Sequence, residues 1–155
     1  SKDRTVYEKG RVPVSAVICY ESVYGEFVTE FVTRGAQLIF VITNDGWWKN
    51  TGGHRQHFVY SRLRAVETRR SIARAANTGI SCFINQRGDV IQRTNYWTRD
   101  VIRNTVNAND VITFYAKHGD YIGRGMSIVS GLLLLISVLV YAANRISHRK
   151  THLKG

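Results

Sequence analysis

The pattern of apolar and polar positions in the first half of the chain predicts strands that alternate with helices. Apolar runs at residues 12–19 and 38–42 are typical of strands, and the second run is uninterrupted, which predicts a strand buried on both faces. Between them, apolar residues recur at the spacing of one helix face within residues 25–34. A strand, a helix and a strand joined by short connections predict a parallel pair in a layered α/β sheet.

In the second half of the chain, the apolar segments are shorter and less regular. Residues 54–70 return to helical spacing, with an apolar stripe of Phe58, Val59, Leu63 and Val66. Shorter apolar segments predict five further strands, the last two from weaker signals, at residues 72–76, 80–84, 90–93, 101–106 and 111–115. Polar residues 85–89 predict a hairpin turn between two of these strands.

A long apolar segment near the C-terminus predicts a transmembrane helix. Residues 125–144 contain no charged side chain, and 20 residues at a helical rise cover roughly 30 Å, the thickness of the hydrocarbon core of a bilayer. We therefore predict three parts: a globular domain at 1–123, a transmembrane helix at 124–145 and a basic tail at 146–155. Basic residues flanking a span favour the cytoplasmic side, which places the tail in the cytoplasm and the globular domain in the periplasm of a bacterium.

Charge and cysteine content narrow the functional classes. The formal net charge is +11, and the last part of the chain has no acid; its basic residues are Arg124, Arg145, Arg149, Lys150 and Lys154. Such charge suits nucleic acid or anionic lipid, and the adjacent apolar segment favours lipid, so no nucleic-acid partner is predicted. Two cysteines in 155 residues exclude a small disulfide scaffold, although a bond between them stays open, and Cys82 is predicted to be a small buried hydrophobe.

Candidate chemistry gathers where two neighbouring strands end. Cys19 closes the first strand, Glu21 follows it, and a loop from Asn44 to Trp48 follows the next strand. Since loops at the carboxyl ends of parallel strands converge, these residues are expected to face one another. Cys19 is then either a nucleophile at a strand-to-helix corner or a buried structural thiol.

Four sequence segments together resemble a known superfamily. They are C-Y-E at residues 19–21, N-D-G-W-W at 44–48, R-L-R-A-V-E-T-R-R at 62–70 and R-A-A-N-T-G-I-S at 74–81. The combination resembles the second half of the nitrilase, or carbon–nitrogen hydrolase, superfamily, and with the C-terminal apolar segment it is similar to the membrane branch, the apolipoprotein N-acyltransferases. The resemblance implies an α/β fold, the C-terminal half of an α-β-β-α sandwich, followed by one transmembrane helix.

The resemblance also implies a set of catalytic residues. Cys19 matches the nucleophile, and the backbone N–H of Tyr20 matches an oxyanion donor. The glutamate base and the lysine of the family lie upstream of the cysteine strand, and Glu8, Lys2 and Lys9 are too close to that strand to match them. The resemblance therefore implies the back part of a longer protein, with an incomplete triad and no activity of its own.

Three further residues receive supporting roles. Glu21 either orients the missing base or lysine, as the family implies, or caps the following helix. Trp47 and Trp48, in the loop that begins at Asn44, either pack over the sheet edge or form a mobile lid that guides acyl chains at the bilayer interface.

The reaction that the resemblance implies is an acyl transfer. The thiolate of Cys19 would take an acyl group from a phospholipid as a thioester, and the N-terminal amine of a diacylglyceryl-modified apolipoprotein would accept it as an amide, at the inner membrane of a bacterium. No metal or organic cofactor is implied, and His54 and His57 are predicted to be solvated or hydrogen-bonded rather than metal ligands. Two alternatives remain: a membrane-tethered amidase or nitrilase acting on small amides, and a non-catalytic, membrane-anchored basic binding domain.

Overall fold

The computed structural model describes residues 4–152, and the side chains of residues 4–142. The chain forms two compact units, Ser1–Gly119 and Asp120–Gly155, and each is described by itself.

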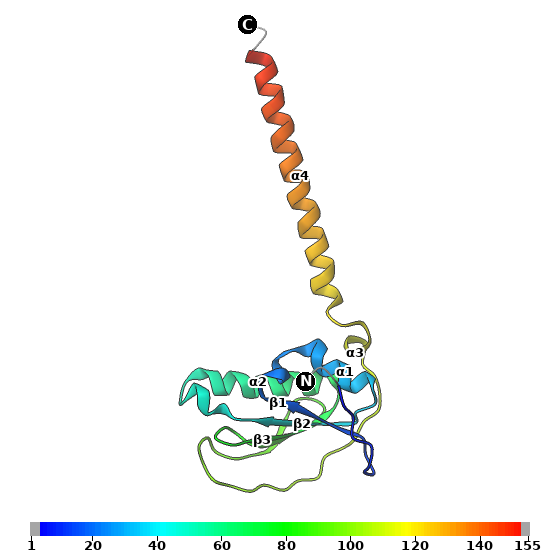
Figure 1. Ribbon diagram of the computed structural model, residues 1–155, viewed down its shortest axis with the longest axis vertical. Helices are drawn as coiled ribbons and strands as arrows, with labels where there is room; N and C mark the ends of the chain where they lie inside the picture. Colours follow the sequence, from blue (N-terminus) through cyan, green and yellow to red (C-terminus); the bar gives the residue numbers. More distant parts are fainter. Residues whose placement is uncertain (1–3, 153–155) are drawn as a thin grey trace. The chain divides into compact units, whose positions relative to one another are not determined.

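A mixed five-stranded sheet forms the centre of the first unit, with its strands in chain order (Figure 1). The strands are β1 Val14–Ile18, β2 Leu38–Thr43, β3 Ser71–Ala76, β4 Cys82–Ile84 and β5 Val90–Arg93. The first three strands are parallel, whereas β4 and β5 are antiparallel to their neighbours. The parallel pair predicted from the alternation of apolar segments is thus confirmed.

Two helices connect the parallel strands and cover one face of the sheet (Figure 1). They are α1 Gly25–Thr33 and α2 Gly52–Thr68. The core lies between these helices and the sheet; its most buried members include Val17, Val28, Val32, Ile39, Val41, Ile72, Cys82 and Ile84. Full burial of one such aliphatic side chain contributes about 1.5–3 kcal/mol, so this single apolar layer holds the unit together.

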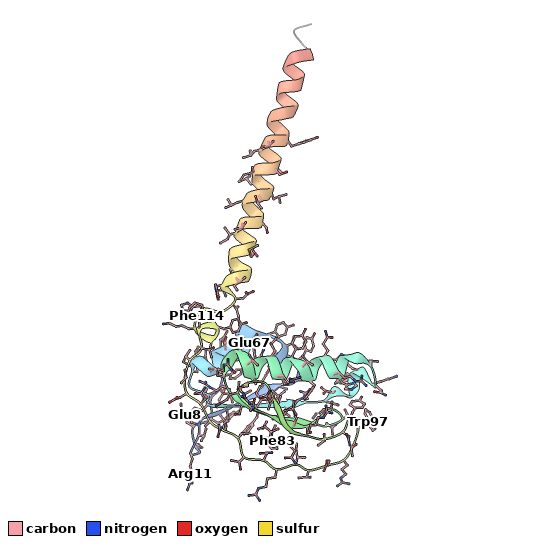
Figure 2. The ribbon with its side chains drawn as sticks, turned by 180° about the vertical axis from the view of Figure 1, so that it is seen from behind. Glu8, Arg11, Glu67, Phe83, Trp97 and Phe114 are labelled. Atoms are coloured by element: carbon pink, nitrogen blue, oxygen red, sulfur yellow. The ribbon has the colours of Figure 1, made fainter. Side chains whose placement is uncertain are left out.

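The other face of the sheet stays partly open. Phe40 and Ile42 are 38% and 50% exposed, so the prediction that this strand is buried on both faces is wrong for the described residues. Phe83 lies on the side of the sheet away from α2 (Figure 2), where Val101 and Ile102 help to line an open hollow of about 400 Å³. The reason is architectural, because both helices pack on the same face.

The helix α2 buries a polar face instead of its apolar stripe. Of the predicted stripe only Phe58 is buried, whereas Val59, Leu63 and Val66 are 52%, 42% and 39% exposed. The buried polar side chains of α2 are those of His54, His57, Ser61, Arg64 and Thr68. Burial of such groups is tolerated where they have partners: His57 contacts Asp45 at 2.9 Å, and the Thr68 hydroxyl donates to the Arg64 carbonyl at 2.7 Å.

The last two predicted strands are absent from the described chain. Residues 101–113 are irregular, and residues 114–118 form a short helix, α3 Phe114–His118. Backbone carbonyls of this segment accept side-chain hydrogen bonds instead of joining the sheet: Asn107 accepts from Ser71 at 2.8 Å and Val111 from Arg70 at 2.8 Å. Strand propensity depends on pairing with neighbouring strands, and residues 101–113 pair with none of the described strands.

The second unit is one long helix, α4 Tyr121–His152. Its segment Tyr121–Ala142 is long and apolar enough to cross a membrane. The boundaries 123/124 and 145/146 stay predictions, and the basic side chains predicted to flank the span, Arg145, His148, Arg149, Lys150 and Lys154, lie outside the described side chains.

Candidate active site

Cys19 stands at the corner where β1 leaves the sheet. It is the first residue of a 3-10 helix, η1 Cys19–Val23, which leads into α1. Its φ angle is +49°, a left-handed conformation that costs a residue with a Cβ roughly 1–2 kcal/mol. The thiol is half-buried and free. The surrounding fold therefore holds a strained cysteine at the edge of the sheet, which is the corner predicted from the sequence.

The two residues after Cys19 have different environments. Tyr20 is 50% exposed, and its ring centroid lies 6.3 Å from that of Trp48. The carboxylate of Glu21 accepts a hydrogen bond from the backbone N–H of Ile18 at 2.8 Å. This contact closes the start of η1, the short helix that contains Glu21, and not the following helix α1, whose N-cap Tyr24 makes no side-chain capping bond. The role of Glu21 toward a base or lysine stays a proposal.

The tryptophan loop lies beside this corner, because β1 and β2 are in register with Ile18 opposite Ile42. Its centre is a 3-10 helix, η2 Asp45–Trp48. Trp48 is half-buried, whereas Trp47 is 80% exposed. Trp48 thus packs against Tyr20 and His57, and the lid interpretation of the exposed Trp47 stays a proposal.

Asn44 holds this loop rather than pointing into open space. Its side-chain oxygen accepts from the backbone N–H of Gly46 at 3.1 Å and from the hydroxyl of Thr78 at 2.8 Å. The loop is thereby tied to the turn between β3 and β4. A Cβ at Gly79 in that turn would lie 2.8 Å or closer to side-chain atoms of Asp45, so this position requires glycine.

A buried charged network lies beneath Cys19. Asp45, which is fully buried, contacts His57 Nδ1 at 2.9 Å and Arg74 Nη2 at 2.5 Å. The hydroxyl of Thr43 donates to the same carboxylate at 3.1 Å. The network joins η2, α2 and β3, and its members Asp45 and Arg74 are 29 residues apart in the sequence.

The electrostatics of this network favour an ionised Asp45. Burial by itself raises the pKa of the Asp45 carboxyl. The hydrogen bond from His57 and the charge of Arg74 outweigh burial and hold that pKa below its ordinary value. The site thus contains a stable carboxylate that balances the guanidinium.

The network reaches the backbone of Cys19 through His57. Its Nε2 lies 3.1 Å from the carbonyl oxygen of Cys19 and 3.0 Å from Ser22 Oγ. Ser22 Oγ donates to the same carbonyl at 2.9 Å. Among the described residues, no three His, Cys, Asp or Glu side chains form a metal-binding group.

Comparison with known proteins identifies the fold family. The family model described as carbon-nitrogen hydrolase matches residues 1–116. The chain belongs to the carbon-nitrogen hydrolase family. Its mixed sheet is thus that of a nitrilase-superfamily α/β fold.

Among curated relatives, the similar proteins are named apolipoprotein N-acyltransferase. That of Chlorobaculum tepidum is 38% identical over 128 residues, which is 83% of this chain and 24% of the relative. That of Thermotoga maritima is 33% identical over 149 residues, 90% of this chain and 29% of the relative. The chain spans about a quarter of the length of these relatives.

Solved structures support the fold. An amidase from Nesterenkonia sp. has a TM-score of 0.54 and 20% identity, over 79% of this chain and 46% of the other. A Saccharomyces cerevisiae member of branch 10 of the nitrilase superfamily has a TM-score of 0.55 and 16% identity, over 64% of this chain and 39% of the other.

The second cysteine of this carbon-nitrogen hydrolase chain has the opposite environment to the first. Cys82 is 1% exposed in β4, as predicted for a small buried hydrophobe. Burial raises the pKa of the Cys82 thiol to about 12, despite the opposing charges of Arg74 and Arg93. The thiolate is the reactive form of cysteine, so Cys82 is chemically inert in the folded chain.

We expect iodoacetamide to distinguish the two thiols. With a pKa of about 12, roughly one Cys82 side chain in 10⁴ is ionised at pH 8, and that side chain is also closed to reagent. Peptide mass mapping of the native chain at pH 8 should find the adduct on Cys19, and the unfolded chain should carry it on both cysteines. Comparable labelling of Cys82 in the native chain would contradict this assignment.

The sequence-based predictions missed four residues of the site, Ser22, Asp45, His57 and Arg74. His57 was predicted to be solvated or hydrogen-bonded, and it is buried and hydrogen-bonded. An arginine in the middle of an apolar strand, at Arg74, was the available signal, because a buried guanidinium requires a carboxylate partner. Which carboxylate it meets depends on the register of β2 and β3, and periodicity does not give that register.

Proposed function

We propose that this chain supplies the nucleophile-bearing part of an enzyme that N-acylates lipoproteins. The observation that carries the proposal is the place of Cys19, a strained and half-buried thiol at a strand end in a carbon-nitrogen hydrolase fold. The relatives named apolipoprotein N-acyltransferase support the substrate class. The match to the Thermotoga maritima relative covers 90% of this chain. Fewer than 19 residues therefore lie outside the match, so the matched part includes Cys19.

The proposed reaction has two steps. The Cys19 thiolate attacks the ester carbonyl of a phospholipid acyl chain; the ester C–O bond breaks, and the lysophospholipid leaves with a proton from the general acid. The α-amine of a diacylglyceryl-modified N-terminal cysteine then attacks the thioester, so that an amide forms, the C–S bond breaks and the amine proton passes to the general base.

The remaining residues of the chain have supporting roles in this proposal. The backbone N–H of Tyr20 stabilises the oxyanion, and Glu21 orients the base or lysine that the family carries upstream. Trp48 packs beside Tyr20, and the exposed Trp47 meets acyl chains at the bilayer surface. Asn44 holds the loop that carries both indoles.

The apolar helix α4 fits the same substrates. A phospholipid and a lipid-modified protein are both held in a membrane, so an enzyme anchored there meets them in two dimensions. We propose that α4 spans the inner membrane of a bacterium, with the first unit in the periplasm and the C-terminus in the cytoplasm. The 155 residues alone are expected to be inactive, because the base and the lysine are not among them.

An acyl-transfer assay tests this function. The protein is expressed from its complete gene, and membranes are incubated with phospholipid and a diacylglyceryl-modified lipopeptide. We expect the lipopeptide to gain the mass of one acyl chain in an amide that resists mild base. Release of ammonia from small amides, without acyl transfer to the lipopeptide, would contradict the proposal and favour an amidase.

A further inference from the structure

We infer that His57, together with Ser22, positions the peptide that follows the nucleophile by holding the carbonyl group of Cys19. This inference rests on the proposed role of Cys19 and adds two positioning residues to it. The two side chains come from different elements, α2 and η1, and both are buried, at 2% and 0% exposed.

The contact geometry converges on one oxygen atom. His57 Nε2 lies 3.1 Å from the carbonyl oxygen of Cys19, and Ser22 Oγ donates to it at 2.9 Å. In a trans peptide the C=O group and the N–H group of the next residue point in opposite directions. Fixing the Cys19 carbonyl on the buried side therefore directs the Tyr20 N–H away from the network, toward the side on which an oxyanion would bind.

The partners of His57 define where its hydrogens are. Nδ1 faces a carboxylate oxygen of Asp45 at 2.9 Å, and Nε2 faces the carbonyl of Cys19, and both oxygens are acceptors. Since the Ser22 hydroxyl donates to the Cys19 carbonyl and also lies 3.0 Å from Nε2, Nε2 is placed to donate to the Cys19 oxygen and to Ser22 Oγ. Arg74 Nη2 lies 3.3 Å from Nδ1, and its hydrogen bond goes to the second oxygen of Asp45. Asp45 therefore pairs with Arg74 through one oxygen and contacts His57 through the other.

This arrangement also explains how the strain at Cys19 is maintained. A left-handed φ persists only where the surroundings determine it, and the Cys19 carbonyl has two buried partners. Hydrogen bonds to a carbonyl polarise the whole amide, so the N–H of Tyr20 becomes a stronger donor. The hydrogen bonds to the Cys19 carbonyl therefore act on the stability of the oxyanion, and they do not involve the Cys19 thiol.

The test separates oxyanion formation from thiol reactivity. In the protein expressed from its complete gene, His57→Leu should lower kcat for acyl transfer by about 10- to 100-fold, since misplacing a donor costs less than removing it, while KM changes less than about threefold. His57→Gln, whose amide can donate to the Cys19 carbonyl, should recover most of the rate. Ser22→Ala should show a smaller loss in kcat.

Alkylation of Cys19 by iodoacetamide is the second readout, because that reaction forms no oxyanion. His57→Leu should keep the wild-type alkylation rate at Cys19, and Cys82 should stay unlabelled, which shows that the chain has folded. His54→Leu is the matched control, an equally buried histidine of α2 that stacks on Tyr96, and its kcat should stay near wild type.

Three results would overturn the inference: parallel losses of alkylation and acyl transfer in His57→Leu, no rescue by His57→Gln, or an equal effect of His54→Leu. Failure of the proposed function itself looks different, because the wild-type protein would then transfer no acyl group to the lipopeptide.

Discussion

Cys19→Ala, in the protein expressed from its complete gene, is expected to abolish acyl transfer to a diacylglyceryl-modified lipopeptide. Covalent catalysis has no second route in the proposed site, since the other cysteine, Cys82, is buried with a pKa of about 12. The loss should be at least about 10³-fold, as expected when an enzyme loses its nucleophile. The measurement is the initial rate of lipopeptide acylation in membranes with matched protein amounts.

The control variants are chosen on the structure. Alanine and serine both carry a Cβ, so Cys19→Ala and Cys19→Ser keep the same backbone strain at φ +49° and change the sulfur alone. Cys82→Ala removes the other sulfur and should leave the rate within about twofold. Retention of a tenth or more of the wild-type rate by Cys19→Ala would show that the chemistry lies elsewhere.

The largest loss of stability is expected from removal of the carboxylate of Asp45. In Asp45→Ala, the guanidinium of Arg74, which is 3% exposed, loses its buried charged partner, and His57 Nδ1 loses its contact with that carboxylate. Removing one partner of a buried ion pair typically costs about 3–5 kcal/mol. The free energy of unfolding of the full chain, followed by tryptophan fluorescence in denaturant and detergent, should fall by this order.

The matched control is an exposed ion pair of the same type. Asp89 contacts Arg87 at 3.1 Å, with side chains 56% and 78% exposed, so Asp89→Ala should shift the denaturation midpoint little. Equal shifts for the two variants would show that the buried network does not stabilise the fold.

The Asp45 carboxylate makes the free energy of unfolding depend on pH. Burial raises the pKa of Asp45, but the hydrogen bond from His57 and the charge of Arg74 hold it below the unfolded value. Asp45 therefore contributes stability that is fully present above the unfolded pKa of about 4 and is lost as the pH falls through the folded pKa. In Asp45→Asn this acid-side loss should be smaller than in wild type, and an unchanged acid limb would contradict the assignment.

The parts of the fold that the sequence predicts well depend on local patterning. The uninterrupted run at 38–42 and the helical spacing at 25–34 became β2 and α1, because each pattern matches the period of one element. The corner at Cys19 followed from the same logic, since a strand that ends in a polar triplet before a helix must turn there.

The parts that the sequence does not predict depend on long-range contacts. The apolar residues Val59, Leu63 and Val66 suggested a core face for α2, yet the buried face contains His57 and Arg64. Polar burial is stable here because partners come from elsewhere in the chain, as Asp45 does for His57. Helical periodicity carries no information about such partners.

Burial on the open face of the sheet also depends on long-range contacts that the sequence pattern does not show. Ile18, Phe40 and Ile42 have the apolar character of core residues but are 50%, 38% and 50% exposed in the described chain. An α-β-β-α sandwich covers this face with a second sheet, so burial on both faces is a property of the complete fold rather than of these residues alone.

The proposed function depends on Cys19 forming the acyl-enzyme. The most direct measurement is peptide mass mapping of the protein, expressed from its complete gene and incubated with phospholipid in the absence of a lipopeptide acceptor. The peptide containing Cys19 is expected to gain the mass of one acyl chain and to lose it with hydroxylamine or on addition of acceptor. An acyl adduct on any other residue, or acyl transfer with no adduct on Cys19 under rapid quenching, would contradict the role of Cys19 as the nucleophile.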